Sequence, residues 1–158
     1  MTEDYRNHAW RYFELHASQR MAVFNFFLVL SGLIAAGLAA AVQAAGLLLI
    51  VGAVLGLLLA LVSFIFWKLD QRVSFLIKHA EQALIEIESV FPKTATQLFT
   101  NEVALTEHAT SSGSLWTRQW TYGHSFRVVF IIMGLAGLLG SCISLGRYAG
   151  WICWPGAS

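Results

Sequence analysis

The fold is decided by residues 21–67, which read MAVFNFFLVLSGLIAAGLAAAVQAAGLLLIVGAVLGLLLALVSFIFW and contain no Asp, Glu, Lys or Arg. A helix needs about 20 apolar residues to cross the hydrocarbon core of a bilayer, so this stretch is long enough for two crossings. The segment 42–46 interrupts it near the middle and predicts a tight turn. We therefore expect an all-α integral membrane protein whose first two spans form a helical hairpin.

The composition of the whole chain is also that of a membrane protein. Hydrophobic residues make up 57% of it and charged residues 12%, against about 25% charged in a soluble domain. A third uncharged run, Val128–Leu145, predicts a third span, with a buried core helix as the alternative. The formal net charge of +1 gives no electrostatic reason to expect a nucleic-acid partner, and we expect none.

The charged residues divide the chain into four segments. We predict an amphipathic helix over residues 1–20, the hairpin over 21–67, a helical segment over 68–127, and the third span with a short tail over 128–158. Basic residues gather in the first and third of these segments, whereas the loop of the hairpin carries none and the tail carries only Arg147. By the positive-inside rule, the N-terminus and residues 68–127 are cytoplasmic and the C-terminus lies outside.

Small residues recur every four positions in both spans of the hairpin. Such ladders let two helix backbones approach closely. Because a few residues join the two spans, we predict that the ladders pack against each other in a tight antiparallel pair. The ladder residues are Gly32, Ala36 and Ala40 in the first span and Gly52, Gly56 and Ala60 in the second.

The helix that follows the second span carries an apolar stripe with heptad spacing, and its charged residues, Asp70 among them, are expected on the other faces. The helix should end near Phe91, because Pro92 disfavours helix in the residue before it. The stripe is too broad for one neighbour, and a segment of this size cannot enclose it alone. We therefore predict a homo-oligomer. Its seam residues are Leu69, Val73, Leu76, Ala80, Ala83, Ile87 and Val90.

Motifs for catalysis or metal binding are weak in this sequence. The five histidines include no pair at i, i+4, so we expect no zinc site and no cofactor. The sequence from Arg118 to His124 has the Arg–His spacing of HEPN ribonucleases. Two other Arg–His pairs have similar spacing, so the pattern arises easily by chance and is weak evidence for a ribonuclease. A ribonuclease is the minor alternative to a protein that is not an enzyme.

The spans contain no ionisable residue, which disfavours ion-coupled transport. A pore between subunits, a membrane-disrupting assembly or a scaffold remain. The polar candidates for lining a pore or for bonding between helices are Asn25, Ser31 and Ser63. The alternative for Asn25 is a position at the level of the lipid headgroups. A pore with these walls would be apolar at its narrowest point and would gate by dewetting.

The run His16–Phe27, followed by Phe66–Arg72 and the helix around Ala80-Glu81, resembles the RipA-like octameric membrane proteins, which are small bacterial inner-membrane proteins. The resemblance covers roughly residues 5–145 and implies a ring-shaped octamer in the bacterial inner membrane. In layout alone, the chain is also similar to accessory membrane proteins of antiphage systems, including the pore-forming partner of some RNA-targeting CRISPR effectors.

Two functions follow from these observations as hypotheses. The first is a ring-shaped pore or membrane-permeability effector in stress or phage defence. The second is a non-conducting scaffold in the bilayer that recruits a cytoplasmic protein partner through residues 68–127.

Overall fold

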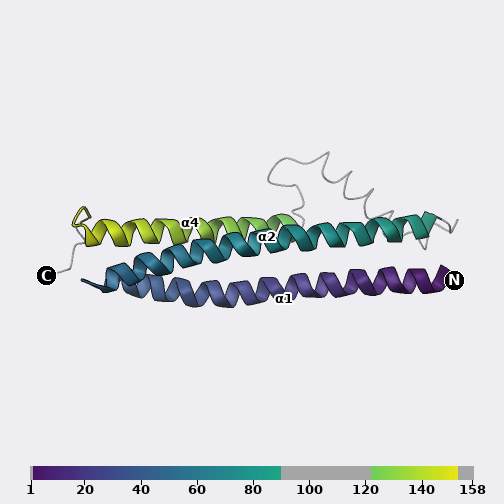
Figure 1. Ribbon diagram of the computed structural model, residues 1–158, viewed down its shortest axis with the longest axis horizontal. Coiled ribbons are helices and arrows are strands. Elements are labelled where there is room, and N and C mark those ends of the chain that lie inside the picture. The colour runs from purple at the N-terminus through teal and green to yellow at the C-terminus, as the bar shows by residue number, and fades with distance from the viewer. Residues whose placement is uncertain (1, 90–121, 153–158) are drawn as a thin grey trace. The chain divides into compact units, whose positions relative to one another are not determined.

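In the computed structural model, residues 2–89 and 122–152 are described, and they fold into three α-helices (Figure 1). These are α1 (Thr2–Gln43), α2 (Leu48–Ser89) and α4 (Tyr122–Tyr148). Each contains a segment long and apolar enough to cross a membrane, by length and composition. No strand occurs among the described residues. The predicted all-α fold with three candidate spans is confirmed.

The chain divides into two compact units, which are described separately. The membrane unit comprises Ala22–Asp70 and Phe126–Ser158, and the juxtamembrane unit comprises Met1–Met21 and Gln71–Ser125. Both α1 and α2 continue without a break through the boundary between the units. The N-terminal helix and the first span are therefore one helix.

The turn of the hairpin lies where the sequence predicted it. Helix α1 ends at Gln43, and α2 begins at Leu48. Gly46 has a φ of +63°, a left-handed conformation that glycine adopts without a steric penalty. Its carbonyl accepts a hydrogen bond from the Leu49 amide at 3.2 Å, which starts the second helix.

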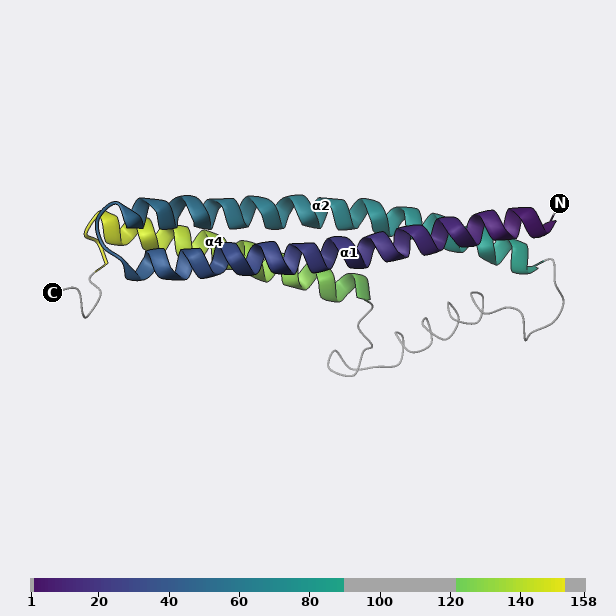
Figure 2. The same ribbon diagram turned by 90° about the horizontal axis from the view of Figure 1, so that it is seen from below.

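In the membrane unit, α1, α2 and α4 lie side by side (Figures 1 and 2). Their side chains form two apolar clusters. One is aromatic and is centred on Phe27, Phe126 and Phe130. The rings of Phe24 and Phe126 stack with centroids 4.0 Å apart. The other is aliphatic and is centred on Ile34, Leu38 and Leu59. The clusters join residues from all three helices, so α4 is an integral part of this core.

Helix α4 ends in a Schellman motif. Gly150 adopts a φ of +75°. The Trp151 amide donates to the Gly146 carbonyl at 2.8 Å, and the Gly150 amide donates to the Arg147 carbonyl at 3.1 Å. These bonds satisfy carbonyls that the last helical turn would leave open.

In the juxtamembrane unit, the most buried side chains of α2 are Ile77, Ala80 and Leu84. Their spacing of three and four residues places them on one helix face. The Arg20 guanidinium of α1 lies close to Gly123, where a Cβ would come within 2.9 Å of one of its nitrogens. Because Gly123 has no side chain, the Arg20 guanidinium can occupy the space beside it.

Candidate assembly surface

The ladder of the first span is open to its surroundings. Gly32, Ala36 and Ala40 are all exposed. A Cβ added at Gly32 would meet no atom within 4 Å. Among residues 2–89 and 122–152, none therefore packs closely on the smooth face that these residues create.

The ladder of the second span is closed by α4. A Cβ at Gly56 would lie 2.5 Å from the Gly137 carbonyl oxygen, and a Cβ at Gly137 would lie 2.6 Å from the Gly56 carbonyl oxygen. The two backbones thus touch at a point where no side chain fits. A Cβ at Gly52 would instead meet side chains, with the Ser144 hydroxyl at 2.7 Å and the Ala41 Cβ of α1 at 3.2 Å. The sequence suggested the first ladder as the partner of the second, and the structure places α4 against Gly56 instead.

This pairing has a sequence signal that the hairpin interpretation missed. Helix α4 carries its own series of small residues, with Gly137, Ser141 and Ser144 spaced four and three apart. All three are buried. Two small-residue series of matching length favour a close crossing of the helices that carry them.

The polar candidates of the spans fall into two groups. Ser31 and Ser63 are buried and donate hydrogen bonds to carbonyls of their own helices, Ser31 to Leu28 at 3.2 Å and Ser63 to Leu59 at 2.8 Å. A hydroxyl that bonds to the preceding turn needs no partner from another helix. Asn25, in contrast, is exposed on α1.

The predicted seam of α2 is partly used inside the chain. Ala80 is only 4% exposed, so a charge placed there would disturb the chain's own packing before it affected any contact between chains. Leu69 is 43% exposed. Val90 lies outside the described residues. The remaining four residues are half-buried, namely Val73, Leu76, Ala83 and Ile87.

An ion pair between Asp70 of α2 and Arg127 of α4 joins the two helices near the start of α4. The Arg127 Nε lies 3.7 Å from a carboxylate oxygen of Asp70, whose side chain is 4% exposed. The sequence placed Asp70 on a face other than the apolar stripe, and it did not indicate that the side chain would be buried against α4. Its charge can be buried here because a guanidinium from α4 lies beside it.

A second polar contact ties α4 to the hairpin at the opposite end of the same helix. The Arg147 guanidinium donates to the backbone carbonyl of Val42, in the last turn of α1. Carbonyls at a helix C-terminus have no partner within the helix and carry partial negative charge, so a cation is stabilising there. The single basic residue after the third span therefore has a structural role.

No catalytic arrangement emerges from the described residues. They contain no group of three or more His, Cys, Asp and Glu that could hold a metal ion. His16 belongs to one of the Arg–His pairs, and its Nδ1 lies 3.1 Å from the Gln19 side-chain oxygen. His124 is exposed, and Arg118 lies outside the described residues. The surface of the membrane unit is therefore the better place to look for function.

Comparisons with known proteins agree with this emphasis on assembly. The model of the octameric membrane protein family (8xMP) matches residues 3–146. The chain is also 46% identical over 134 residues to CD-NTase-associated protein 19 of Escherichia coli, with 84% of this chain and 85% of that protein covered. No solved structure matches the chain. The resemblance to octameric membrane proteins noted in the sequence is thereby confirmed.

Proposed function

Because the chain belongs to the octameric membrane protein family, we propose that its copies assemble side by side through the outward face of α1 and enclose a pore. The supporting observation is a contrast in composition between the exposed faces of the three spans. The assembly would act as a membrane-permeability effector in stress or phage defence.

The exposed face of α2 suits lipid. Every fully exposed residue of α2 between Leu48 and Ile65 is large and apolar. Helix α4 is similar, since between Ile131 and Leu145 it exposes only Ala136 and Cys142 besides large aliphatic residues. Bulky apolar side chains gain nothing from a neighbouring helix that they would not gain from acyl chains.

The exposed face of α1 differs. Between Ala22 and Gln43, α1 exposes seven small or polar residues and four large apolar ones. Small side chains let a neighbouring backbone approach, and exposed polar side chains favour protein or water over lipid. This face therefore suits contact with a second copy or with the centre of a ring. The seven are Ala22, Asn25, Gly32, Ala36, Ala39, Ala40 and Gln43.

A conduit lined by this face would have polar ends and an apolar middle. Asn25 and Gln43 lie near the two ends of the span, and Gly32, Ala36 and Ala40 lie between them. A narrow apolar segment excludes water and blocks ions until it widens. The partly exposed stripe on α2 would supply a further contact between copies, with Leu69 as its most exposed described member.

A scaffold is the second candidate, and the name of the relative favours it. The Escherichia coli protein is named for its association with a CD-NTase. If this chain has the same association, residues 68–127 would recruit that protein to the membrane and no ions would flow. Neither candidate requires the chain to be an enzyme.

The orientation that the sequence suggests remains part of the proposal, with the N-terminus in the cytoplasm and the C-terminus in the periplasm. Because the Arg147 side chain bonds to the Val42 carbonyl, the charge after the third span serves the fold. One basic residue after the third span, against nine in residues 1–20 and 68–127, leaves the charge asymmetry of the positive-inside rule in place.

Ion flux through liposomes that contain the purified assembly tests the pore. We expect Ala36→Asn to raise flux at least tenfold, because an amide on this face would hydrate the apolar middle of the conduit. Ala136→Asn on α4 is the matched control, since it changes another exposed alanine of a span. Tight liposomes with both variants would exclude the pore and favour the scaffold, for which co-purification with a CD-NTase is the positive test.

A further inference from the structure

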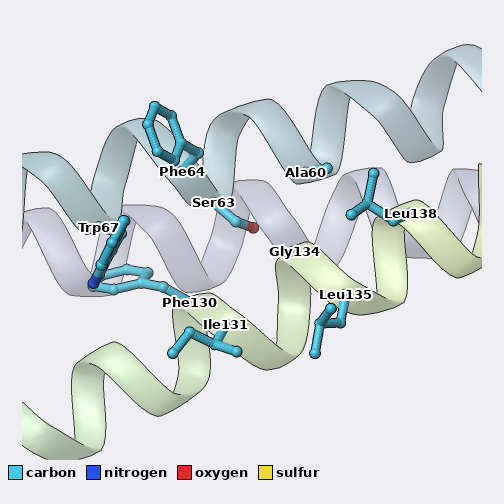
Figure 3. Close-up of a pocket in the computed structure, with 9 residues that line it drawn as sticks. All are labelled: Ala60, Ser63, Phe64, Trp67, Phe130, Ile131, Gly134, Leu135 and Leu138. Atoms are coloured by element: carbon cyan, nitrogen blue, oxygen red, sulfur yellow. The ribbon is translucent and has the colours of Figure 1, made fainter.

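A shallow apolar groove lies between α2 and α4 in the membrane unit (Figure 3). Its volume is about 200 Å³. Small residues form its floor, because a Cβ at Gly134 would already lie 3.5 Å from the Cβ of Ser63. Large side chains such as Phe64 and Leu135 border it. The Ser63 hydroxyl donates to its own helix, so the groove offers no polar partner to its occupant.

One end of the groove is aromatic and carries a cation. Trp67 lines this end and packs against the aromatic cluster of the membrane unit. The Lys68 ammonium lies 5.0 Å from the centroid of the Trp67 ring and 5.8 Å from that of Phe64. In the part of the chain that the structure describes, Lys68 makes no ion pair with a carboxylate. The Lys68 charge, which has no carboxylate partner among the described residues, therefore lies beside one end of the apolar groove.

The groove is long enough to follow about two thirds of the hydrocarbon depth of one leaflet. From Trp67 to Ala60 the groove follows seven residues of α2, or about 10 Å at 1.5 Å per residue. The hydrocarbon of one leaflet is about 15 Å deep. The charged residues Lys68, Asp70 and Arg127 all lie beyond the aromatic end, where lipid headgroups would be. The apolar end therefore points toward the middle of the bilayer.

We infer that this groove binds one acyl chain of an anionic phospholipid, whose phosphate pairs with Lys68. A lysine ammonium is a common phosphate partner, and its four-carbon stem reaches along an apolar surface to the headgroups. A zwitterionic lipid brings its own cation and would gain less from Lys68. A second copy of the chain is a poorer occupant, because bulky side chains border the groove and keep a helix backbone away.

Native mass spectrometry of the assembled protein tests the inference, with phosphatidylglycerol and phosphatidylethanolamine of equal chain length as probes. We expect phosphatidylglycerol to be retained in preference to phosphatidylethanolamine. Gly134→Leu fills the floor of the groove and should weaken lipid retention at least tenfold. Ala136→Leu adds the same side chain two residues away, outside the groove lining, and should have no effect.

The headgroup contact is tested separately with Lys68→Gln. This change should abolish the preference for phosphatidylglycerol while the acyl chain still binds. Equal retention of both lipids by the unchanged protein would overturn the anionic preference, and full retention by Gly134→Leu would overturn the groove as the site.

A photoreactive acyl chain keeps the inference testable if Gly134→Leu does not fold. Phosphatidylglycerol with a diazirine in one chain should label peptides that contain Leu135 of the unchanged protein. Labelling elsewhere, or a disulfide between subunits formed by Leu135→Cys, would show that lipid does not occupy the groove. These outcomes do not depend on whether the assembly conducts ions.

Discussion

Helices α1 and α2 carry ladders of small residues with the same four-residue spacing, but the two ladders have different surroundings in the structure. On α2, Gly56 meets Gly137 of α4 so closely that neither position has space for a side chain. On α1, the space around Gly32 is open. Spacing of small residues therefore gives a helix the ability to be approached closely, and the partner comes from the rest of the sequence. Here α4 closes one ladder, whereas no described residue closes the other.

The largest expected effect comes from Gly137→Leu. Its Cβ would overlap the Gly56 carbonyl oxygen, and backbone on both sides would have to move. Overpacking of this kind destabilises by about 3 kcal/mol or more when backbone is the obstacle. Thermal unfolding in detergent, followed by circular dichroism, should show a lower midpoint and a poor yield. A midpoint equal to that of the unchanged protein would mean that α2 and α4 do not cross there.

The same substitution at Gly32 should separate folding from assembly. The Cβ of Gly32→Leu would come within 4 Å of no atom of another helix, so the free energy of unfolding should change by no more than about 0.5 kcal/mol. The added side chain should instead hold neighbouring copies apart. Light scattering of the detergent-solubilised protein should then report a particle smaller than an octamer. An unchanged mass would show that the open ladder of α1 is not a contact between copies.

The ion pair between Asp70 and Arg127 should contribute a moderate effect, because it holds one end of α4 over the α2 ladder. The Arg127 side chain is about half-buried, and its Nε lies 3.7 Å from a carboxylate oxygen of Asp70. We expect a coupling of about 1 kcal/mol, between that of an exposed pair and that of a buried one. A double-mutant cycle of Asp70→Asn and Arg127→Gln measures it. Additive effects would show that the pair does not hold α4 in place.

Among the changes that remove a contact within the chain, Arg147→Gln at the other end of α4 is expected to have the smallest effect. Loss of the bond to the Val42 carbonyl should cost about 0.3–1 kcal/mol, the range for a cation at a helix C-terminus. The unfolding midpoint should fall slightly, and the particle mass should not change. If the mass changes instead, this contact supports assembly and not the fold of one chain.

Much of the fold was predictable from hydropathy. The uncharged run predicted two spans, and the polar and glycine residues near Gly46 predicted the turn between them. The heptad stripe and Pro92 predicted a long helix after the second span, which α2 confirms as far as Ser89. These features depend on local sequence, and the bilayer requirement for about 20 apolar residues makes them easy to recognise.

The contacts of α4 were not predictable in the same way. The sequence around Gly56 is equally compatible with Gly32 and with Gly137 as its partner. Three helices allow three pairings, and the spacing of small residues does not distinguish among them. Asp70 follows Lys68 and precedes Arg72, a pattern typical of a solvated face, yet Arg127 from the distant third span allows it to be buried. Both depend on residues far apart in the chain.

The meeting of Gly56 with Gly137 has a consequence for biosynthesis. About 80 residues separate the two glycines, so at 5–20 residues per second the ribosome needs roughly 4–16 s to make the partner of a ladder that has already entered the bilayer. During this interval, nascent hairpins on neighbouring ribosomes present the same smooth surface to one another. Truncated chains that end before α4 should therefore cross-associate through α2, and correct subunit contacts should begin only after translation is complete.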